Sequence, residues 1–224
     1  MVTRHRVFRF HPNLEAGPPF RITGADRIPR AVFVGQGSAD GACGFCSLLM
    51  ALTVAGALSP SSIRRIHDRT YGRLFRLREL VTPQMFSGMD VEDMEAALKL
   101  FSGLIDFRSF EGRHAATLRF SLGHLEEGCC VLVAIQQRGA SHGHWVLATG
   151  TEGIQTQSGR YRPESILLLD PEEDPTALVP FNSRLSLQRN SCESRTMRYA
   201  PRIRGPQIVT LTAAIAVWKR TRPR

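Results

Sequence analysis

The chain has 224 residues, of which 42% are hydrophobic and 22% are charged, a balance typical of ordinary globular proteins. No apolar stretch is long enough to span a bilayer, and residues 1–10 lack the uninterrupted apolar core of a secretory signal. These features argue against a helical membrane protein and against export through a signal peptide. We therefore expect a cytoplasmic protein, or an effector that is delivered without a signal peptide.

The formal net charge is +9 and comes almost entirely from arginine, because Lys99 and Lys219 are the only lysines. A strongly basic chain can favour nucleic acid, anionic lipid or acidic partners. The arginines are scattered, however, and no aromatic-interleaved RNA-binding motif or helix-turn-helix pattern accompanies them. We interpret the charge as a solvated basic surface in preference to a nucleic-acid site. Nothing in the sequence indicates the oligomeric state.

The five cysteines are an odd number, and two of them are adjacent in an apolar run where they would act as small hydrophobic residues. An odd count without an export signal argues against a disulfide framework, so we expect reduced thiols. The cysteines are Cys43, Cys46, Cys129, Cys130 and Cys192.

The first half of the chain favours helices. Residues 1–35 read as an N-terminal extension of short strand-like pieces broken by prolines. Residues 43–55 are apolar or small on every side, which predicts a buried helix that stops at Gly56. A second helix is expected over residues 61–71, and a further helical turn over residues 73–81.

The clearest amphipathic helix begins near Gly88. Asp90 can cap it, and Asp93 follows three residues later. Its apolar residues recur at helical spacing and form one stripe. They are Val91, Met94, Leu98 and Phe101.

Beyond this helix the hydrophobic period changes to that of strands. We expect short strands over residues 107–110 and 117–120, and a turn over residues 122–127. Residues 150–163 are polar and rich in turn residues, so they form either a substrate-contacting loop or a long hairpin tip. Helices followed by antiparallel strands indicate an α+β fold. The longer expected strands span residues 130–136, 144–149, 166–169 and 208–217.

One cysteine has surroundings that would activate a thiol. Cys43 begins the predicted buried helix, where unpaired backbone N–H groups and the helix dipole favour a thiolate. The preceding loop is rich in small residues and leaves room for a substrate carbonyl. Gln36, on that loop, could donate its side-chain amide to a developing oxyanion together with the Cys43 N–H.

A base and an orienting acid follow on neighbouring strands. His144 opens a predicted strand directly after a glycine, where an imidazole can protrude from the sheet edge. Asp170 ends the next strand, and antiparallel neighbours would bring these two ends together. Asp170 could then accept from the ring and fix its tautomer. A nucleophile at a helix N-terminus facing a base on a sheet is the papain-like arrangement.

These residues resemble the signature of the C39-like peptidases, which are bacterial papain-fold enzymes. The first part is Gln36 followed by residues 43–56, CGFCSLLMALTVAG. The second part is LEEG at residues 125–128, HWVLATG at residues 144–150, and an apolar strand ending in Asp170 and proline. No single fragment is specific, but the ordered set is more so.

The resemblance covers residues 36–171 and implies a papain-like fold in which N-terminal helices pack on an antiparallel sheet. It assigns residues 36–171 to a catalytic core, with residues 172–224 as loops and a strand that complete the same domain. It implies peptide-bond cleavage by a triad of Cys43, His144 and Asp170, with Gln36 as oxyanion donor. Many members remove leader peptides while fused to an exporter, and this chain has no exporter, so that substrate is not implied.

Several other residues could carry chemistry. Cys46 makes a Cys-x-x-Cys pair with Cys43, which resembles a dithiol redox site, although a core position inside the helix fits it better. His142 competes with His144 as the base, and we interpret it as a loop residue. Glu172 and Asp174 are acidic alternatives to Asp170, and Asp40 could cap the helix. No second pair completes a zinc site, so we expect no metal and no cofactor.

Three functions fit this set of residues. The first is a cysteine peptidase that cleaves a peptide or protein through an acyl-enzyme. The second is an acyltransferase, transglutaminase-like enzyme or deamidase, because the same triad serves when a different nucleophile resolves the thioester. The third is a non-catalytic basic binding module on a peptidase fold.

Overall fold

The computed structural model describes residues 4–17, 19–23, 27–37, 41–140, 142–175, 179–187 and 195–221. Within these ranges the first part of the chain contains β1 (Arg4–Phe10), β2 (Arg21–Thr23), β3 (Pro29–Ala31), α1 (Cys43–Val54), α2 (Pro60–Arg64), α3 (Gly72–Val81), η1 (Thr82–Met85) and α4 (Val91–Lys99). The remainder contains β4 (Ile105–Glu111), α5 (His114–Glu126), β5 (Cys130–Gln137), β6 (His144–Thr156), β7 (Tyr161–Leu169), β8 (Ser183–Ser186), β9 (Met197–Pro201) and β10 (Gln207–Lys219).

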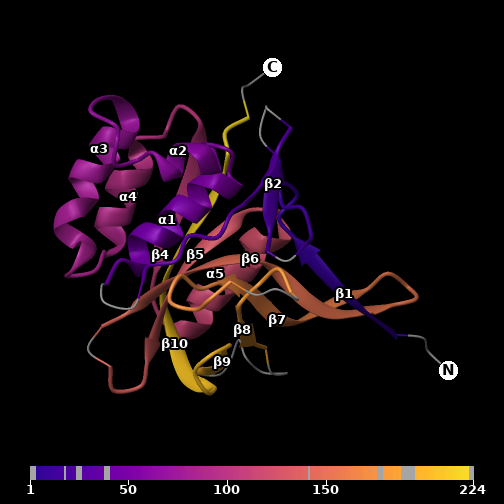
Figure 1. Ribbon diagram of the computed structural model, residues 1–224. Coiled ribbons are helices and arrows are strands. Elements are labelled where there is room, and N and C mark those ends of the chain that lie inside the picture. Colours follow the sequence, from indigo (N-terminus) through magenta and orange to yellow (C-terminus); the bar gives the residue numbers. More distant parts are fainter. Residues whose placement is uncertain are drawn as a thin grey trace.

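Six of the strands close into an antiparallel β-barrel (Figure 1). The hydrogen-bonded order is β6-β5-β10-β9-β8-β7, and β7 pairs back onto β6. Two extra strands attach to this ring, β1 to β6 and β4 to β10. Helices account for only 26% of the structure. The expected α+β papain-like fold, with N-terminal helices on an antiparallel sheet, is therefore wrong, because the protein is mostly β.

The ring closes through two short strands that the sequence pattern did not predict. Strand β8 pairs with β7 on one side and with β9 on the other, and β9 pairs with β10. These strands are only four and five residues long and lie among polar, turn-forming residues, so they lack a clear alternating pattern. Without β8 and β9 the other strands would form an open sheet, and β8 and β9 close that sheet into a barrel.

The barrel wall separates two hydrophobic cores. Side chains alternate along a strand, so β5, β6, β7 and β10 each contribute to both cores. In β5, Val131 and Val133 belong to one core, and Leu132 and Ala134 belong to the other. All six ring strands contribute to the first core, which the ring encloses, and α5 adds Leu118 to it. The second core lies between the wall and helices α1, α3 and α4.

A β-bulge in β10 changes which side chains face inward. Before it, Val209 and Leu211 belong to the enclosed core, and after it Ala214 belongs there instead. The register against β5 shifts between Leu211 and Ala213, so Thr212 is the extra residue. Odd-numbered residues therefore face inward before Thr212, and even-numbered residues face inward after it.

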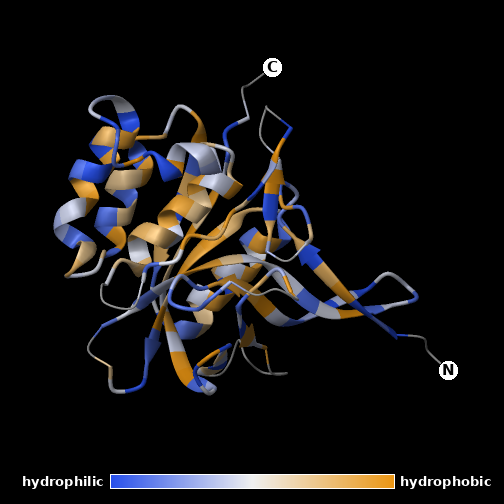
Figure 2. Ribbon diagram, in the orientation of Figure 1, coloured by the Kyte–Doolittle hydropathy of each residue, from blue (hydrophilic) through white to orange (hydrophobic). Residues whose placement is uncertain are grey.

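Helix α1 forms because every side chain in it can be buried. All twelve of its residues are buried, and Figure 2 shows hydrophobic residues along it and the central strands. The predicted helix from residue 43 and its stop at Gly56, which has φ 78°, are confirmed. The predicted cap of α4 is confirmed too, because Asp90 accepts from the Asp93 N–H in a capping box.

Other predicted elements are wrong. Residues 117–120 and 122–127, predicted as a strand and a turn, belong almost wholly to helix α5. The helix predicted over residues 61–71 ends at Arg64, whereas residues 73–81 form the full helix α3. The polar stretch after residue 149 continues β6 and begins β7, so it forms a long hairpin. Within the described ranges, no helix has the length and apolar character needed to cross a membrane.

Candidate active site

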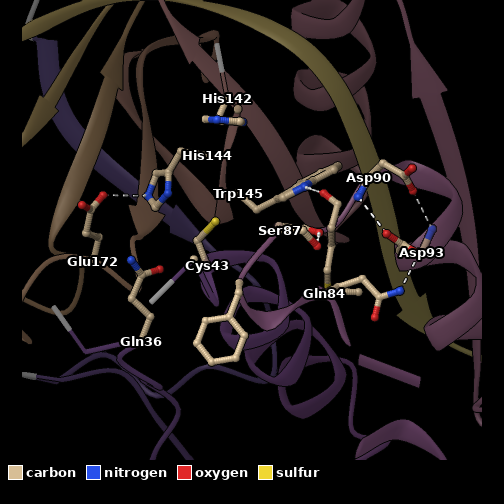
Figure 3. A pocket seen from close by; sticks show the side chains of 15 residues that line it. Gln36, Cys43, Gln84, Ser87, Asp90, Asp93, His142, His144, Trp145 and Glu172 are labelled. Atoms are coloured by element: carbon tan, nitrogen blue, oxygen red, sulfur yellow. Dashed lines mark hydrogen bonds and ion pairs between the residues drawn. The ribbon is translucent and has the colours of Figure 1, made fainter. Parts of the chain in front are cut away.

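The candidate site is a cavity of about 860 Å³ at the N-terminus of α1 (Figure 3). Cys43 is the first residue of that helix, and Ala42 before it makes no side-chain cap. The first backbone N–H groups of the helix are thus not capped by a side chain, and the helix dipole places partial positive charge there. The cavity is also lined by Gln36, His144 and Trp145.

Packing and hydrogen bonds hold this helix end in place. A Cβ built on Gly44 would lie 3.0 Å from the Met89 Cβ, so only glycine lets the two segments approach this closely. The Trp145 indole donates to the Met89 carbonyl at 2.7 Å, and Ser47 donates to the Trp145 carbonyl at 3.0 Å. These bonds connect α1, β6 and the segment before α4 around the thiol.

His144 is positioned by the start of β6. Its Nε2 lies 2.6 Å from Asp170 Oδ1 at the end of β7, because β6 and β7 are antiparallel and paired. The carboxylate accepts, so Nε2 carries the proton. Nδ1 is then the ring nitrogen that can bond the Cys43 thiol. Figure 3 shows the ring and the Cys43 sulfur on the same side of the cavity.

The Cys43 thiol and the His144 imidazole shift each other's pKa in opposite directions. Burial raises the pKa of Cys43, but the hydrogen bond and charge of His144, with the N–H groups of Trp145 and Gly44, lower it below its usual value. Burial lowers the pKa of His144, but Asp170 and Cys43 together raise it to about 10. Both shifts favour a thiolate–imidazolium pair at neutral pH.

Asp170 is fully buried and held by four groups. Its Oδ1 accepts from His144 and from the Glu172 N–H at 2.9 Å, and its Oδ2 accepts from the Tyr199 hydroxyl. The Asn182 side chain bonds both the Asp170 N–H, at 2.7 Å, and the Asp170 carbonyl, at 2.8 Å. Burial raises the pKa of Asp170, but His144 first and Tyr199 next keep it below its usual value. The carboxylate therefore stays ionised.

Gln36 lies in the loop that precedes α1. Its backbone N–H donates to the Pro171 carbonyl at 2.9 Å, which fastens this loop to the turn after Asp170. Its side chain lines the cavity with Cys43, and in Figure 3 it lies beside the cysteine. The structure thus brings Gln36, Cys43, His144 and Asp170 into one site.

The other sequence candidates occupy different positions. Cys46 is buried, and its thiol contacts the Gly35 carbonyl at 3.7 Å. His142 lines the cavity but makes no hydrogen bond with the described part of the chain. Glu172 lies 3.8 Å from the His144 ring and pairs with Arg204 at 2.5 Å. Asp174 lines a separate pocket of about 350 Å³. Asp40 and Cys192 lie outside the described residues.

Sequence reasoning missed Tyr199 and Asn182. Both come from the tail of the chain, where short strands carry no motif, and each acts through Asp170. One short signal was available: Met197 and Tyr199 lie on either side of the charged Arg198, which is the spacing of two residues on one face of a strand. That pattern could have placed Tyr199 on an inward face, although not against a particular carboxylate.

One group of described side chains could hold a metal ion. It consists of His124, Glu127 and Cys129, whose ligand atoms lie within 4.8 Å of one another. His124 bonds Glu127 at 3.0 Å near the end of α5, an ordinary contact at helical spacing. It involves none of the residues around Cys43.

No family model matches the chain. No curated protein matches it either. The chemistry of the site therefore has to be argued from its own residues.

Proposed function

We propose that the protein is a cysteine peptidase that cleaves a peptide or protein substrate through an acyl-enzyme. The observation that supports this most is the Cys43 thiol at a helix N-terminus, in one cavity with the His144 imidazole, whose Nε2 is fixed by a buried carboxylate. A thiolate nucleophile, a base and an orienting acid in one cavity are the parts that acyl transfer requires.

In the proposed reaction, the Cys43 thiolate attacks the carbonyl carbon of the scissile bond. The Gln36 amide and the Cys43 N–H stabilise the resulting oxyanion. The His144 imidazolium then donates its proton to the departing amine as the C–N bond breaks, which leaves a thioester. Next, neutral His144 accepts a proton from water as the water oxygen attacks the thioester carbonyl. The C–S bond then breaks and releases the carboxylic acid and the Cys43 thiolate.

The acidic partner of the histidine is part of the proposal. Asp170 keeps the proton on Nε2, so that Nδ1 serves the sulfur and the leaving group. It remains ionised and stabilises the imidazolium form. Four described cysteines are free thiols, so we place the enzyme in a reducing compartment such as the cytoplasm.

The test combines thiol labelling with product analysis. Wild-type protein, Cys43→Ala and Cys46→Ala would be treated with an iodoacetamide probe at pH 6.5, and then incubated with a diverse peptide library with and without added amines. We expect rapid labelling and new peptide termini from wild type and from Cys46→Ala, and neither from Cys43→Ala, with a loss on the order of 10³-fold or more.

The mass-spectrometric products separate the alternatives. Peptides conjugated to amines would identify an acyltransferase, and a gain of one mass unit at glutamine would identify a deamidase. Cleavage that survives Cys43→Ala would contradict the proposal. So would a Cys43 thiol that labels no faster than a free cysteine, which would favour a binding module.

A further inference from the structure

A second cavity, of about 530 Å³, lies at the N-terminus of α5 beside the bulge in β10. Its volume lies within the range of small-molecule sites. None of its lining residues belongs to the site around Cys43. They are Gly112, Arg113, His114, Ala115, Arg195, Thr210, Leu211 and Thr212.

One wall of this cavity contains a buried donor that has no partner among the described residues. His114 is 6% exposed, and its Nδ1 accepts from the Leu211 N–H at 3.0 Å, next to the bulge. A neutral ring that accepts at Nδ1 carries its proton on Nε2. Burial lowers the pKa of His114, which keeps the ring neutral. Among the described residues, Nε2 has no hydrogen-bond partner.

The bulge accounts for the hydrogen bond at the His114 Nδ1, but it does not account for the N–H group at Nε2. Leu211 cannot give its N–H to a regular ladder beside the extra residue, and the His114 Nδ1 satisfies that N–H. A buried donor left unsatisfied is unfavourable and calls for an acceptor. The Nε2–H therefore needs an acceptor that the described chain does not supply.

Two further features of the cavity are electropositive, namely the N-terminus of α5 and two arginines. Helix α5 has 13 residues, and its N-cap residue, Arg113, makes no side-chain cap. The N-terminal N–H groups and the helix dipole favour an anion at this end. The guanidinium groups of Arg113 and Arg195 make no ion pair within the described ranges, and no described carboxylate lines the cavity.

We propose that this cavity binds an oxyanion of the phosphate class. The Arg113 and Arg195 guanidinium groups would supply charge, the first turn of α5 would supply N–H donors, and the His114 Nε2–H would supply a neutral donor. The ligand is a phosphoryl group, either as inorganic phosphate or as a phosphomonoester. This proposal does not depend on the chemistry of Cys43.

The test measures binding directly, without an activity assay. Inorganic phosphate and phosphoserine would be titrated separately into the full chain at constant ionic strength, followed by calorimetry and by ¹⁵N resonances of the histidine rings. Arg113→Gln and Arg195→Gln should each weaken binding by about tenfold. Arg160→Gln, which removes the same charge from the β6–β7 hairpin, should leave the affinity unchanged.

The ¹⁵N resonances of His114 are measured in the wild-type protein, so this test does not depend on whether a variant folds. The Nε2–H signal should move on titration while Nδ1 keeps the shift of an acceptor. Binding of both ligands, or of phosphoserine alone, supports the proposal and identifies the source of the phosphoryl group. Absence of binding, or equal weakening in Arg160→Gln, would overturn it, as would a His114 signal that does not respond.

Discussion

Two buried cysteines of this protein have opposite surroundings. Cys43 is 8% exposed at the N-terminus of α1, and Cys130 is fully buried at the start of β5. Around Cys43 the neighbours are donors, namely the His144 ring and the N–H groups of Trp145 and Gly44. Around Cys130 the neighbours are acceptors, because its thiol contacts the carbonyls of Ala51 at 3.8 Å and Val217 at 3.5 Å.

The difference shows that burial alone does not decide the state of a thiol. Burial raises the pKa of both cysteines. Donors stabilise a thiolate and reverse that effect for Cys43, whereas burial, with a smaller contribution from Cys129, leaves the pKa of Cys130 far above its usual value. Each prediction below removes or tests one part of this contrast.

The largest effect is expected from His144→Gln. The pKa of Cys43 should rise to its usual value or above, because the burial remains while the cationic partner is lost. In wild type the labelling rate should fall only as the pH drops through the lowered pKa. In the variant the labelling rate should already decrease at every pH below about 9, which gives about a 100-fold loss of rate at pH 6.5. Iodoacetamide rates and thiolate absorbance across pH would measure this.

His142→Gln is the matched control, because this histidine lines the same cavity and lies two residues before His144. Its labelling profile should match that of wild type. If His142→Gln shifted the profile and His144→Gln did not, the assignment of the base would have to be exchanged.

A smaller effect is expected from Tyr199→Phe. The loss of the hydroxyl donor should raise the pKa of Asp170, which in turn lowers the pKa of His144 and weakens the ion pair. We expect about a tenfold loss in labelling rate at neutral pH, with the acid limb of the profile moved to higher pH. Tyr161→Phe, which removes a hydroxyl bonded to Thr151, should leave the profile in place. A uniform loss without a shifted limb would assign Tyr199 a purely structural role.

Gly44→Ala tests the packing that holds the thiol. The added methyl group would lie 3.0 Å from the Met89 Cβ and 3.1 Å from the Met94 Cε, so α1 or the segment before α4 must shift. The free energy of unfolding in urea should fall by about 1–3 kcal/mol. Gly123→Ala in α5 has open space around its Cβ and should be neutral or stabilising. Equal stability of the two variants would contradict the close approach at Gly44.

The smallest effect on reactivity is expected from Cys130→Ala. The native protein should label as fast as wild type, because the Cys130 sulfur is shielded and protonated. Its free energy of unfolding should fall by about 1 kcal/mol, since a small cavity replaces the sulfur. Loss of rapid labelling in this variant would show that the reactive thiol had been assigned to the wrong cysteine.

Much of the local structure could be predicted from the sequence, but the architecture could not. Helix α1 is almost entirely apolar or small, β5 begins with six apolar residues, and Asp90 marks the start of α4, so these elements follow from local rules. The strand predicted around Leu118 was wrong, because the sequence Thr-Leu-Arg-Phe-Ser-Leu fits both the period of a strand and that of a helix. Barrel closure depends on long-range pairing of β8 with β7 and β9, which no local pattern specifies.

The candidate site divides in the same way. Cys43, His144 and Asp170 are predictable because a helix start, a strand start and a strand end each leave a local mark, and Gln36 is predictable from its place in the loop before Cys43. Tyr199 could not be chosen with them, because its contact with Asp170 arises only when β9 joins the ring. Groups that act on a site through another residue are thus the ones that one-dimensional patterns miss.

The extra residue at Thr212 marks a point where this chain can change length by one residue. Leu211 is paired with Ile135 and Ala213 with Ala134, so deletion of Thr212 would leave a regular ladder in which Ala214 and Ala216 still face the enclosed core. Ile215 and Val217 would likewise keep their places in the core beside the helices. A one-residue deletion elsewhere in β10 would instead exchange the two faces of one part of the strand, unless the bulge moved to compensate for it.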